Sequence, residues 1–131
     1  YAVFPGVLGS FVTKIFDLEV GSTGITAEMA KRLGMDVVTG MVTHLTKAEY
    51  FPGGKQIKVK LVVDRATRRV VGGQVAGGED VTQRVNALAI AIQAGMTVYE
   101  LAMARTAYAP PVADVWEPIV LAADSAMRKL G

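Results

Sequence analysis

The sequence predicts an α+β fold, in which helices pack on one face of a small antiparallel sheet of about four strands. Residues 11–77 are rich in β-branched side chains and include stretches where apolar and polar residues alternate, which is typical of strands. Beyond residue 80 the apolar residues recur at helical spacing instead. Because the elements follow the order strand, helix, strands, helices, we expect the helices to cover one face of the sheet.

Strands are expected in the segments 11–20, 36–50, 55–64 and 70–77. The clearest is 55–64, where apolar residues alternate with lysines, as in a strand with one buried and one hydrated face. These apolar residues are Ile57, Val59, Leu61 and Val63. The polar turn 64–69 would join the last two strands into a hairpin.

Four helices are expected from their end signals. The first runs from Thr26, its N-cap, to Leu33, with Gly34 just beyond it. The second and third begin at capping boxes, and the last carries a proline in its first turn. The residues concerned are Asp80 with Gln83, Thr97 with Glu100, and Pro118. Gly95 would close the second helix.

The last helix carries a stripe of small and apolar residues that permits close packing. The stripe consists of Ile119, Ala122, Ala123, Ala126 and Leu130. It could serve either the core or a subunit interface. The sequence alone leaves both possibilities open.

The segment 105–119 (RTAYAPPVADVWEPI) separates two helical runs. Pro110 and Pro111 lack amide donors and hold the residues before them extended, so the segment cannot continue a helix. It also contains Tyr108 and the single tryptophan, Trp116. We therefore expect a rigid, irregular connection here.

Composition limits the chemistry available to the chain. Its 131 residues, 51% hydrophobic and 20% charged, fit one domain over 1–131. The absence of cysteine excludes disulfides, thiolate catalysis and cysteine-based zinc sites, and one histidine offers no metal-ligand spacing. Its apolar runs are shorter than the roughly 20 residues that cross a bilayer. No membrane partner is expected, and we place the chain in the cytoplasm.

The net charge of +2 is only mildly basic. A cluster of lysines and arginines lies between Lys55 and Arg69, without an aromatic residue on which a base could stack. A hydrated hairpin face is therefore favoured, and no nucleic-acid partner is expected. Binding of nucleic acid by this hairpin remains a weaker alternative.

Two further patterns resemble chemical sites. GGQVAGGED (72–80) has the glycines of a phosphate loop, but Glu79 and Asp80 at the helix start would repel a phosphate. Tight backbone packing explains its glycines better. His44 and Glu49 are five residues apart on an expected strand, so they point to opposite faces and would need a bend between them to meet as an acid–base pair. His44 is expected to be an ordinary sheet residue.

Tyr50 and Tyr108 each stand on an irregular, proline-containing segment, where functional groups are often held on a scaffold. From the residues alone, the simpler interpretation is a pair of boundary aromatics whose hydroxyls reach water. A functional role is the alternative.

Several stretches occur together in the order and spacing of a known family: GVLGSFVTKIFDLEVGSTGIT, YFPGG, KLVVDRATRRVVGGQVAGGEDV and RVNALAIAIQAGMTVYELAMARTAYAPPVADVWEPI. They closely resemble the C-terminal dimerisation domain of FAD-dependent pyridine nucleotide-disulfide oxidoreductases. The resemblance is to the branch of NADH oxidases, NADH peroxidases and coenzyme A-disulfide reductases. It implies a homodimeric, FAD- and NAD(P)H-dependent oxidoreductase whose active site this domain completes.

The resemblance also implies where the cofactors and the catalytic groups lie. FAD and NAD(P)H would be held by preceding domains, so this chain alone binds neither and is inactive. Tyr50 of YFPGG and Tyr108 of YAPP would be catalytic, reaching across the dimer toward the partner subunit's flavin and redox cysteine. The chain would then be the third domain of a larger flavoenzyme.

The sequence also departs from related patterns. The glutathione-reductase branch uses a His–Glu pair late in this domain, whereas RTAYAPP has no histidine, so His44 does not inherit that role. Departures from the closer branch occur at Ser10, Arg68, Val112 and Glu117. They leave open whether the electron acceptor is oxygen, peroxide or a coenzyme A-type disulfide. The alternative function is a free-standing α+β module that binds a small ligand or a partner, with no flavoenzyme attached.

Overall fold

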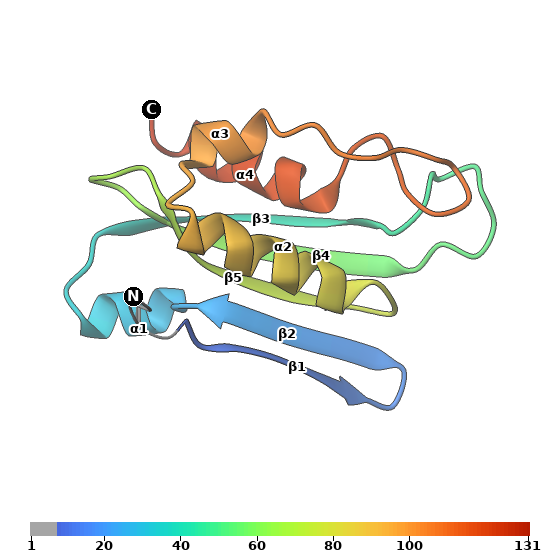
Figure 1. Cartoon of the computed structure of the whole chain (residues 1–131), viewed down its shortest axis with the longest axis horizontal. Coiled ribbons are helices and arrows are strands. Elements are labelled where there is room, and N and C mark those ends of the chain that lie inside the picture. Colours follow the sequence, from blue (N-terminus) through green and yellow to red (C-terminus); the bar gives the residue numbers. More distant parts are fainter. Residues whose placement is uncertain (1–7) are drawn as a thin grey trace, which may run out of the picture.

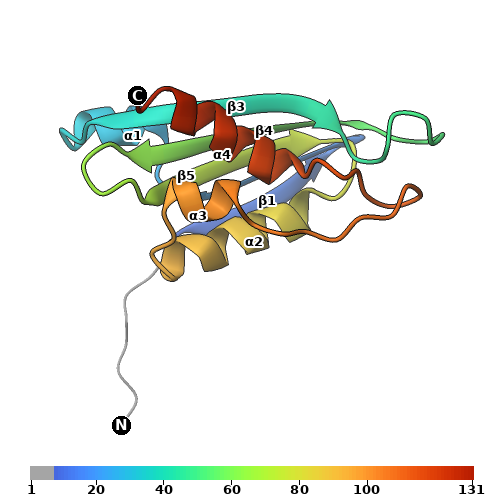
Figure 2. The same cartoon turned by 90° about the horizontal axis from the view of Figure 1, so that it is seen from above.

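The computed structural model describes residues 8–131. It contains an antiparallel sheet of five strands in the order β1-β2-β5-β4-β3. Helices α2, α3 and α4 cover one face of the sheet, and α1 lies in the connection between β2 and β3 (Figures 1 and 2). The expected α+β class is confirmed. The strands are β1 Ser10–Ile15, β2 Leu18–Gly24, β3 Val37–Leu45, β4 Gln56–Asp64 and β5 Val70–Gly77. The helices are α1 Ala27–Arg32, α2 Val81–Gln93, α3 Val98–Ala102 and α4 Pro118–Arg128.

The expected strand 11–20 is in fact a β-hairpin, which adds a strand to the sheet. β1 and β2 pair up to Ile15 and Leu18, leaving Phe16 and Asp17 as the turn. Phe16 adopts a φ of 53°, a left-handed conformation that glycine and asparagine prefer. Asp17 is the turn's one usual turn residue, and with the apolar Phe16 beside it the strand-like composition continues through the reversal and conceals it.

The strand expected over 36–50 ends earlier, at Leu45. Thr46 then donates its amide to the carbonyl of Lys55 at 2.9 Å, which closes the base of the loop between β3 and β4. We call residues 46–55 the Tyr50 loop. Tyr50 therefore lies on a loop rather than at the end of a strand.

Most of the expected helix ends are confirmed. The Thr26 hydroxyl accepts from the amide of Met29 at 3.1 Å and caps α1. Thr97 and Glu100 form the reciprocal capping box at the start of α3. Gly34 and Gly95 follow α1 and α2 with φ values of 71° and 68°, as helix-ending glycines do.

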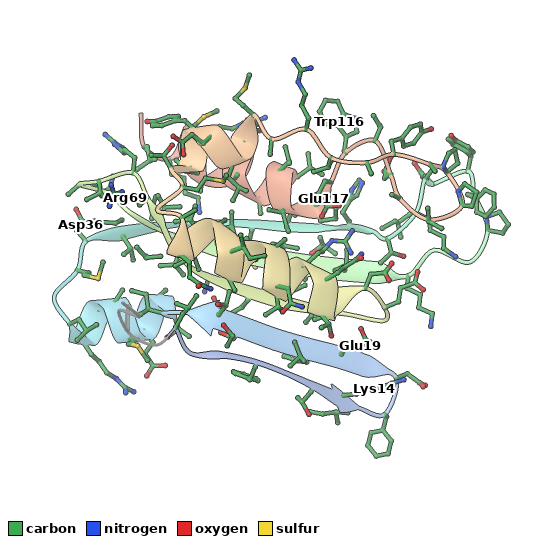
Figure 3. The ribbon with its side chains drawn as sticks, viewed as in Figure 1. Lys14, Glu19, Asp36, Arg69, Trp116 and Glu117 are labelled. Atoms are coloured by element: carbon green, nitrogen blue, oxygen red, sulfur yellow. The ribbon has the colours of Figure 1, made fainter. Side chains whose placement is uncertain are left out.

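The capping box expected at Asp80 and Gln83 is wrong. Asp80 adopts a left-handed conformation with a φ of 60°, and its side chain makes no capping hydrogen bond. A carboxylate from another element takes that place, because Glu19 on β2 accepts from the amide of Val81 at 3.3 Å (Figure 3). The cap of α2 is thus supplied by tertiary structure and not by its own sequence.

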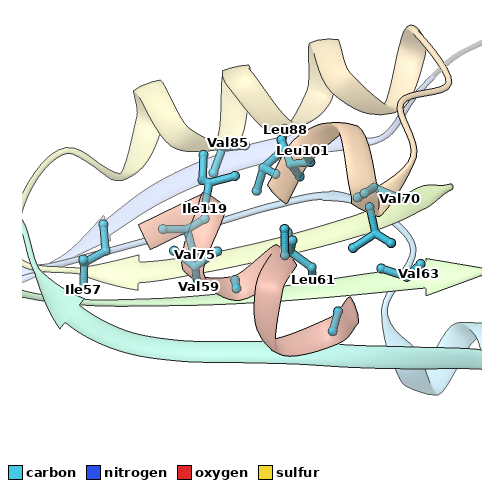
Figure 4. Close-up of a cluster of buried hydrophobic side chains, with 14 of the residues drawn as sticks. Ile57, Val59, Leu61, Val63, Val70, Val75, Val85, Leu88, Leu101 and Ile119 are labelled. Atoms are coloured by element: carbon cyan, nitrogen blue, oxygen red, sulfur yellow. The ribbon is translucent and has the colours of Figure 1, made fainter. Parts of the chain in front are cut away.

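The core lies between the sheet and helices α2 to α4 (Figure 4). Glycines on the strands permit this close packing. A Cβ at Gly21 would lie 2.5 Å from the Val85 side chain of α2, and one at Gly40 would lie 2.2 Å from the Ala122 carbonyl oxygen of α4. The small residues of the last helix therefore serve the core, and Ala122, Ala123 and Ala126 are fully buried.

The opposite face of the sheet carries the lysines that alternate along β4. Lys58 is exposed and Lys60 is partly buried, as the hydrated-hairpin interpretation predicts. No helix within residues 8–131 is long and apolar enough to span a bilayer. The same residues contain no cluster of three or more potential metal-ligating side chains of His, Cys, Asp or Glu.

Candidate functional site

The structure brings Tyr50 and Tyr108 together. Their hydroxyl oxygens are 2.8 Å apart, although the residues are 58 positions apart in the sequence. Tyr50 lies on the Tyr50 loop, and Tyr108 lies on the connection between α3 and α4, residues 103–117, which we call the Tyr108 loop. The two loops lie side by side at one end of the sheet (Figures 1 and 2). Both side chains are exposed, so the pair faces outward from the domain.

Hydrogen bonding alters the chemistry of this pair. The hydrogen bond with Tyr50 raises the pKa of Tyr108 above its ordinary value, with smaller contributions from lost hydration and from the charge of Asp114. A phenol is already protonated at neutral pH, and this shift makes ionisation of Tyr108 less favourable still. When one phenol donates to the other, the second retains an O–H group that can donate to a group outside the pair. The pair can thus offer a proton donor to a developing anion.

The Tyr50 loop is held rigidly at its base. Thr46 is fully buried, and its hydroxyl accepts from the amide of Lys55 at 3.0 Å. The same hydroxyl donates to the carboxylate of Glu79 at 2.5 Å. The apolar side chain of Ala48 is buried within the loop, and its carbonyl accepts from the amide of Phe51 at 2.9 Å. Tyr50 is consequently presented from a loop with a fixed base.

The Tyr108 loop is shaped by its prolines and by a tight turn. Ala109 accepts from the amides of Val112 at 3.0 Å and Ala113 at 2.7 Å, so the chain turns around Pro110 and Pro111. The predicted irregular connection is present at this place, and its rigidity stays a prediction.

A buried ion pair fixes the end of the Tyr108 loop at the start of α4. Arg84 of α2 donates from Nε and Nη2 to the two carboxylate oxygens of Glu117, at 2.7 and 3.1 Å. Its Nη1 donates to the carbonyl of Asp80 at 2.9 Å. The Arg84 side chain is only 5% exposed. The position of Glu117 at the start of α4 is labelled in Figure 3. Sequence reasoning did not find this pair, because an arginine on a helix resembles any surface residue.

His44 does not contact Glu49. Its Nε2 lies 2.8 Å from Oδ2 of Asp114 on the Tyr108 loop, and both side chains are largely buried. His44 does lie on β3, as expected, but it has a partner that no spacing in the sequence indicated.

The glycine-rich stretch before α2 serves packing. A Cβ at Gly72 would lie 1.8 Å from the carbonyl oxygen of Ile25, and one at Gly73 would lie 2.6 Å from the Leu88 side chain. Glu79 is engaged by Thr46. The structure thus agrees with the packing interpretation of these glycines.

Comparison with known proteins identifies the domain. Residues 10–119 match the family model described as the pyridine nucleotide-disulphide oxidoreductase dimerisation domain. The chain is 46% identical over 129 residues to an NADH oxidase of Methanocaldococcus jannaschii, covering 98% of this chain and 29% of that protein. It is 44% identical over 120 residues to a CoA-dependent NAD(P)H sulfur oxidoreductase of Pyrococcus furiosus, covering 92% of this chain and 27% of that protein.

A solved structure gives the same result. An NAD-dependent persulfide reductase from A. fulgidus superposes with a TM-score of 0.92 at 40% identity, over 98% of this chain and 24% of that one. The chain spans less than a third of the length of these relatives. With the matching fold and the family model together, the chain belongs to the pyridine nucleotide-disulphide oxidoreductase dimerisation domain family.

Proposed function

We propose that this domain dimerises and completes the active site of an FAD- and NAD(P)H-dependent oxidoreductase. The observation that supports it most is the outward-facing pair of tyrosines, whose hydroxyls are 2.8 Å apart on two anchored loops. Catalytic groups are often carried on loops that a rigid scaffold positions. The relatives named above, an NADH oxidase and a CoA-dependent sulfur oxidoreductase, support the class of reaction.

The chemical role of the pair is hydrogen-bond and proton donation. In this proposal the flavin and nicotinamide, held by other domains, supply the electrons. Tyr50 and Tyr108 donate toward the partner subunit's redox cysteine, or toward an oxygen of the acceptor, as negative charge develops there. Both phenols are neutral at neutral pH, and the raised pKa of Tyr108 makes its hydroxyl a weaker acid, so this hydroxyl would stabilise the developing anion mainly by hydrogen bonding.

The surface around Tyr108 supports contact with a second copy of the chain. Several large apolar side chains near it project into solvent, which is typical of an interface. They are Met103, Val112, Val115 and Trp116, with exposed fractions between 57% and 81%. Homodimerisation through this surface would bring each tyrosine pair close to the other subunit.

The acceptor class follows from the relatives rather than from the geometry. Reduction of oxygen, peroxide and coenzyme A-type disulfides or persulfides each produces an anion to which a phenol can donate a hydrogen bond. A free-standing module gains no support, because the relatives carry this domain as less than a third of a longer protein. The domain boundaries 1–131 and the cytoplasmic location stay predictions.

The test uses the full-length flavoenzyme that carries this domain. NAD(P)H oxidation is measured with oxygen, hydrogen peroxide, coenzyme A disulfide and coenzyme A persulfide. Tyr108→Phe and Tyr50→Phe are expected to lower kcat on the order of 100-fold with the true acceptor, because removal of one hydrogen-bond donor to a developing anion costs about that much. Reduction of the flavin by NAD(P)H should stay unchanged.

Tyr99→Phe is the matched control, since Tyr99 is also an exposed tyrosine but lies on α3 away from the pair. Wild-type turnover of Tyr108→Phe with every acceptor would exclude the catalytic role.

Dimerisation is tested separately by sedimentation of the 131-residue chain. Trp116→Ala is expected to weaken the dimer by at least about tenfold, because buried tryptophans dominate interface energies. Phe16→Ala is the control, since Phe16 is also an exposed aromatic residue but lies at the turn of the β1–β2 hairpin. A strict monomer at high concentration would contradict an interface built by this domain alone.

A further inference from the structure

The Tyr108 loop is held to the rest of the domain by side chains rather than by its backbone. Between Arg105 and Trp116, the backbone–backbone hydrogen bonds that the structure records join Ala109 only to Val112 and Ala113, inside the loop itself. The loop's orientation therefore depends on the side-chain contacts that cross from it to other elements.

Packing beneath the loop is also incomplete. A hollow of about 450 Å³ is lined by His44 and Trp116 together with residues of α4. A second hollow, of about 420 Å³, lies between α2 and the loop residues Thr106, Ala107 and Val112. Because these hollows adjoin the loop at Trp116 and at residues 106–113, apolar packing constrains the loop less than it constrains a core segment.

His44 and Asp114 make one of the few contacts that cross from the loop to the sheet. The Nε2–Oδ2 distance is 2.8 Å, and the side chains are 28% and 16% exposed. A carboxylate can only accept, so Nε2 of His44 is the donor. The other oxygen of Asp114 accepts from the amide of Val115 at 2.6 Å, which fixes the carboxylate to the loop backbone.

This contact joins the same two parts of the chain as the tyrosine pair does. His44 stands on β3 just before the Tyr50 loop, and Asp114 stands on the Tyr108 loop just after the turn that carries Tyr108. A single hydrogen bond between two loops leaves them free to rotate about it. A second contact at a different point along both segments removes that freedom, so the hydroxyls are held in register.

The buried Arg84–Glu117 pair does not replace this contact. It anchors the end of the loop to α2, whereas Asp114 anchors the part nearer Tyr108 to β3. The two pairs thus hold different points of the loop to different elements.

We propose that the His44–Asp114 hydrogen bond is a clasp that positions Tyr108 against Tyr50, and that both residues are positioning residues for the reaction. This inference rests on the proposed function of the tyrosine pair. Neither His44 nor Asp114 needs to touch the substrate. Their effect on turnover passes through the location of the Tyr108 hydroxyl.

The test compares His44→Leu with His44→Gln in the full-length flavoenzyme. Leucine fills space without a donor, whereas the glutamine amide nitrogen can take the place of Nε2 and donate to Asp114. We expect His44→Leu to lower kcat about tenfold, with little change in the KM for NAD(P)H, because small misplacements of catalytic groups reduce rates strongly. His44→Gln should restore most of the loss.

A spectroscopic measurement reports the geometry directly. With ¹³C-labelled tyrosine and the Tyr108 resonance assigned through Tyr108→Phe, the titration of Tyr108 is followed by NMR. The pKa of Tyr108 is raised first by the hydrogen bond with Tyr50 and least by the charge of Asp114, and His44 is not among the causes. Asp114→Ala measures how much of the shift comes from the lost charge together with the lost contact, and His44→Leu keeps that charge. A fall toward the ordinary value in both His44→Leu and Asp114→Ala, absent in His44→Gln, would therefore indicate that the Tyr50 contact has loosened.

A second variant breaks the same contact from its other side, so the test does not depend on whether the His44 variants fold normally. Asp114→Ala should reduce kcat as much as His44→Leu does, and the double variant should be no worse than either, because the two residues act as one unit. Glu28→Gln, which removes the exposed Glu28–Arg32 pair on α1, is the control and should change nothing.

The outcomes separate the two proposals. An unchanged Tyr108 pKa and kcat in His44→Leu, alongside an impaired Tyr108→Phe, would overturn the clasp. Additive losses in the double variant would overturn it as well. Wild-type turnover of Tyr108→Phe would instead remove the proposed function, while the NMR result would still decide whether the clasp exists.

Discussion

Removal of the Glu117 carboxylate is expected to cost about 4 kcal/mol of folding free energy. In Glu117→Ala the guanidinium of Arg84, in a side chain only 5% exposed, loses both carboxylate oxygens to which it donates. An unpaired buried charge typically costs 3–5 kcal/mol. The substitution also removes the oxygen that accepts from the Ile119 amide at the start of α4, which adds up to about 1 kcal/mol. Water that enters beside Glu117, which is 16% exposed, offsets part of the sum.

The two ends of this ion pair should respond unequally. Arg84→Met leaves the carboxylate of Glu117, which is closer to solvent and can be hydrated, so a loss of about 2 kcal/mol is expected. The double variant Arg84→Met with Glu117→Leu should lose less than the two single variants together. Replacement of a buried ion pair by apolar side chains of similar volume is often close to neutral.

Urea unfolding followed by circular dichroism measures these changes, at one protein concentration because dimerisation adds to apparent stability. Glu28→Ala, which breaks an exposed ion pair, is the control and should cost less than about 0.5 kcal/mol. If Glu117→Ala lies within about 1 kcal/mol of the wild type, the reasoning about an unpaired buried charge is refuted.

Smaller changes in the free energy of unfolding are expected at single glycine, helix-cap and turn positions, each measured by the same unfolding assay. Gly40→Ala should cost at least about 2 kcal/mol, because its Cβ would meet the Ala122 carbonyl at 2.2 Å, and a loss below 1 kcal/mol would contradict the close approach of α4. Gly34→Ala meets no neighbour, so only its φ of 71° matters and about 1 kcal/mol is expected. Thr97→Ala should cost about 1 kcal/mol through the lost cap of α3, and Thr97→Ser should restore it. Phe16→Gly should leave stability unchanged or raise it by up to about 1 kcal/mol, because glycine adopts the left-handed conformation of Phe16 without strain. A clear loss of stability would contradict the left-handed conformation at this turn.

Local signals account for the elements that were predicted correctly. Thr26 and Thr97 cap the helices that their positions indicated, since a cap acts within one turn of the backbone. The alternation over 55–64 identified the buried face of β4 for a similar reason. One error, the hairpin missed within 11–20, arose because the turn at Phe16 has an unusual local composition. Another arose where a distant part of the chain takes over a local role. Asp80 resembled an N-cap, but Glu19 from β2 accepts from the first amide of α2 instead.

In the candidate site too, the sequence indicated individual residues but not the contacts between distant residues. Tyr50 and Tyr108 were singled out by their irregular setting and by the family resemblance. Their mutual hydrogen bond, the clasp of His44 with Asp114 and the anchor of Arg84 on Glu117 have no signal in the sequence. The local sequence around a histidine on a strand or an arginine on a helix does not indicate whether a distant residue will form a hydrogen bond with it.

The sequence by itself determined the fold class, most helix ends, the family and the two tyrosines, because these depend on neighbouring residues or on a shared pattern of motifs. Only the tertiary structure decided how the two tyrosine loops are tied together and which side chains hold them. Those contacts join segments far apart along the chain, such as His44 and Asp114, and their geometry exists only after the sheet and helices have packed. Bringing such distant residues together costs conformational entropy. Packing of the whole core offsets that cost, so no short stretch of residues determines these contacts.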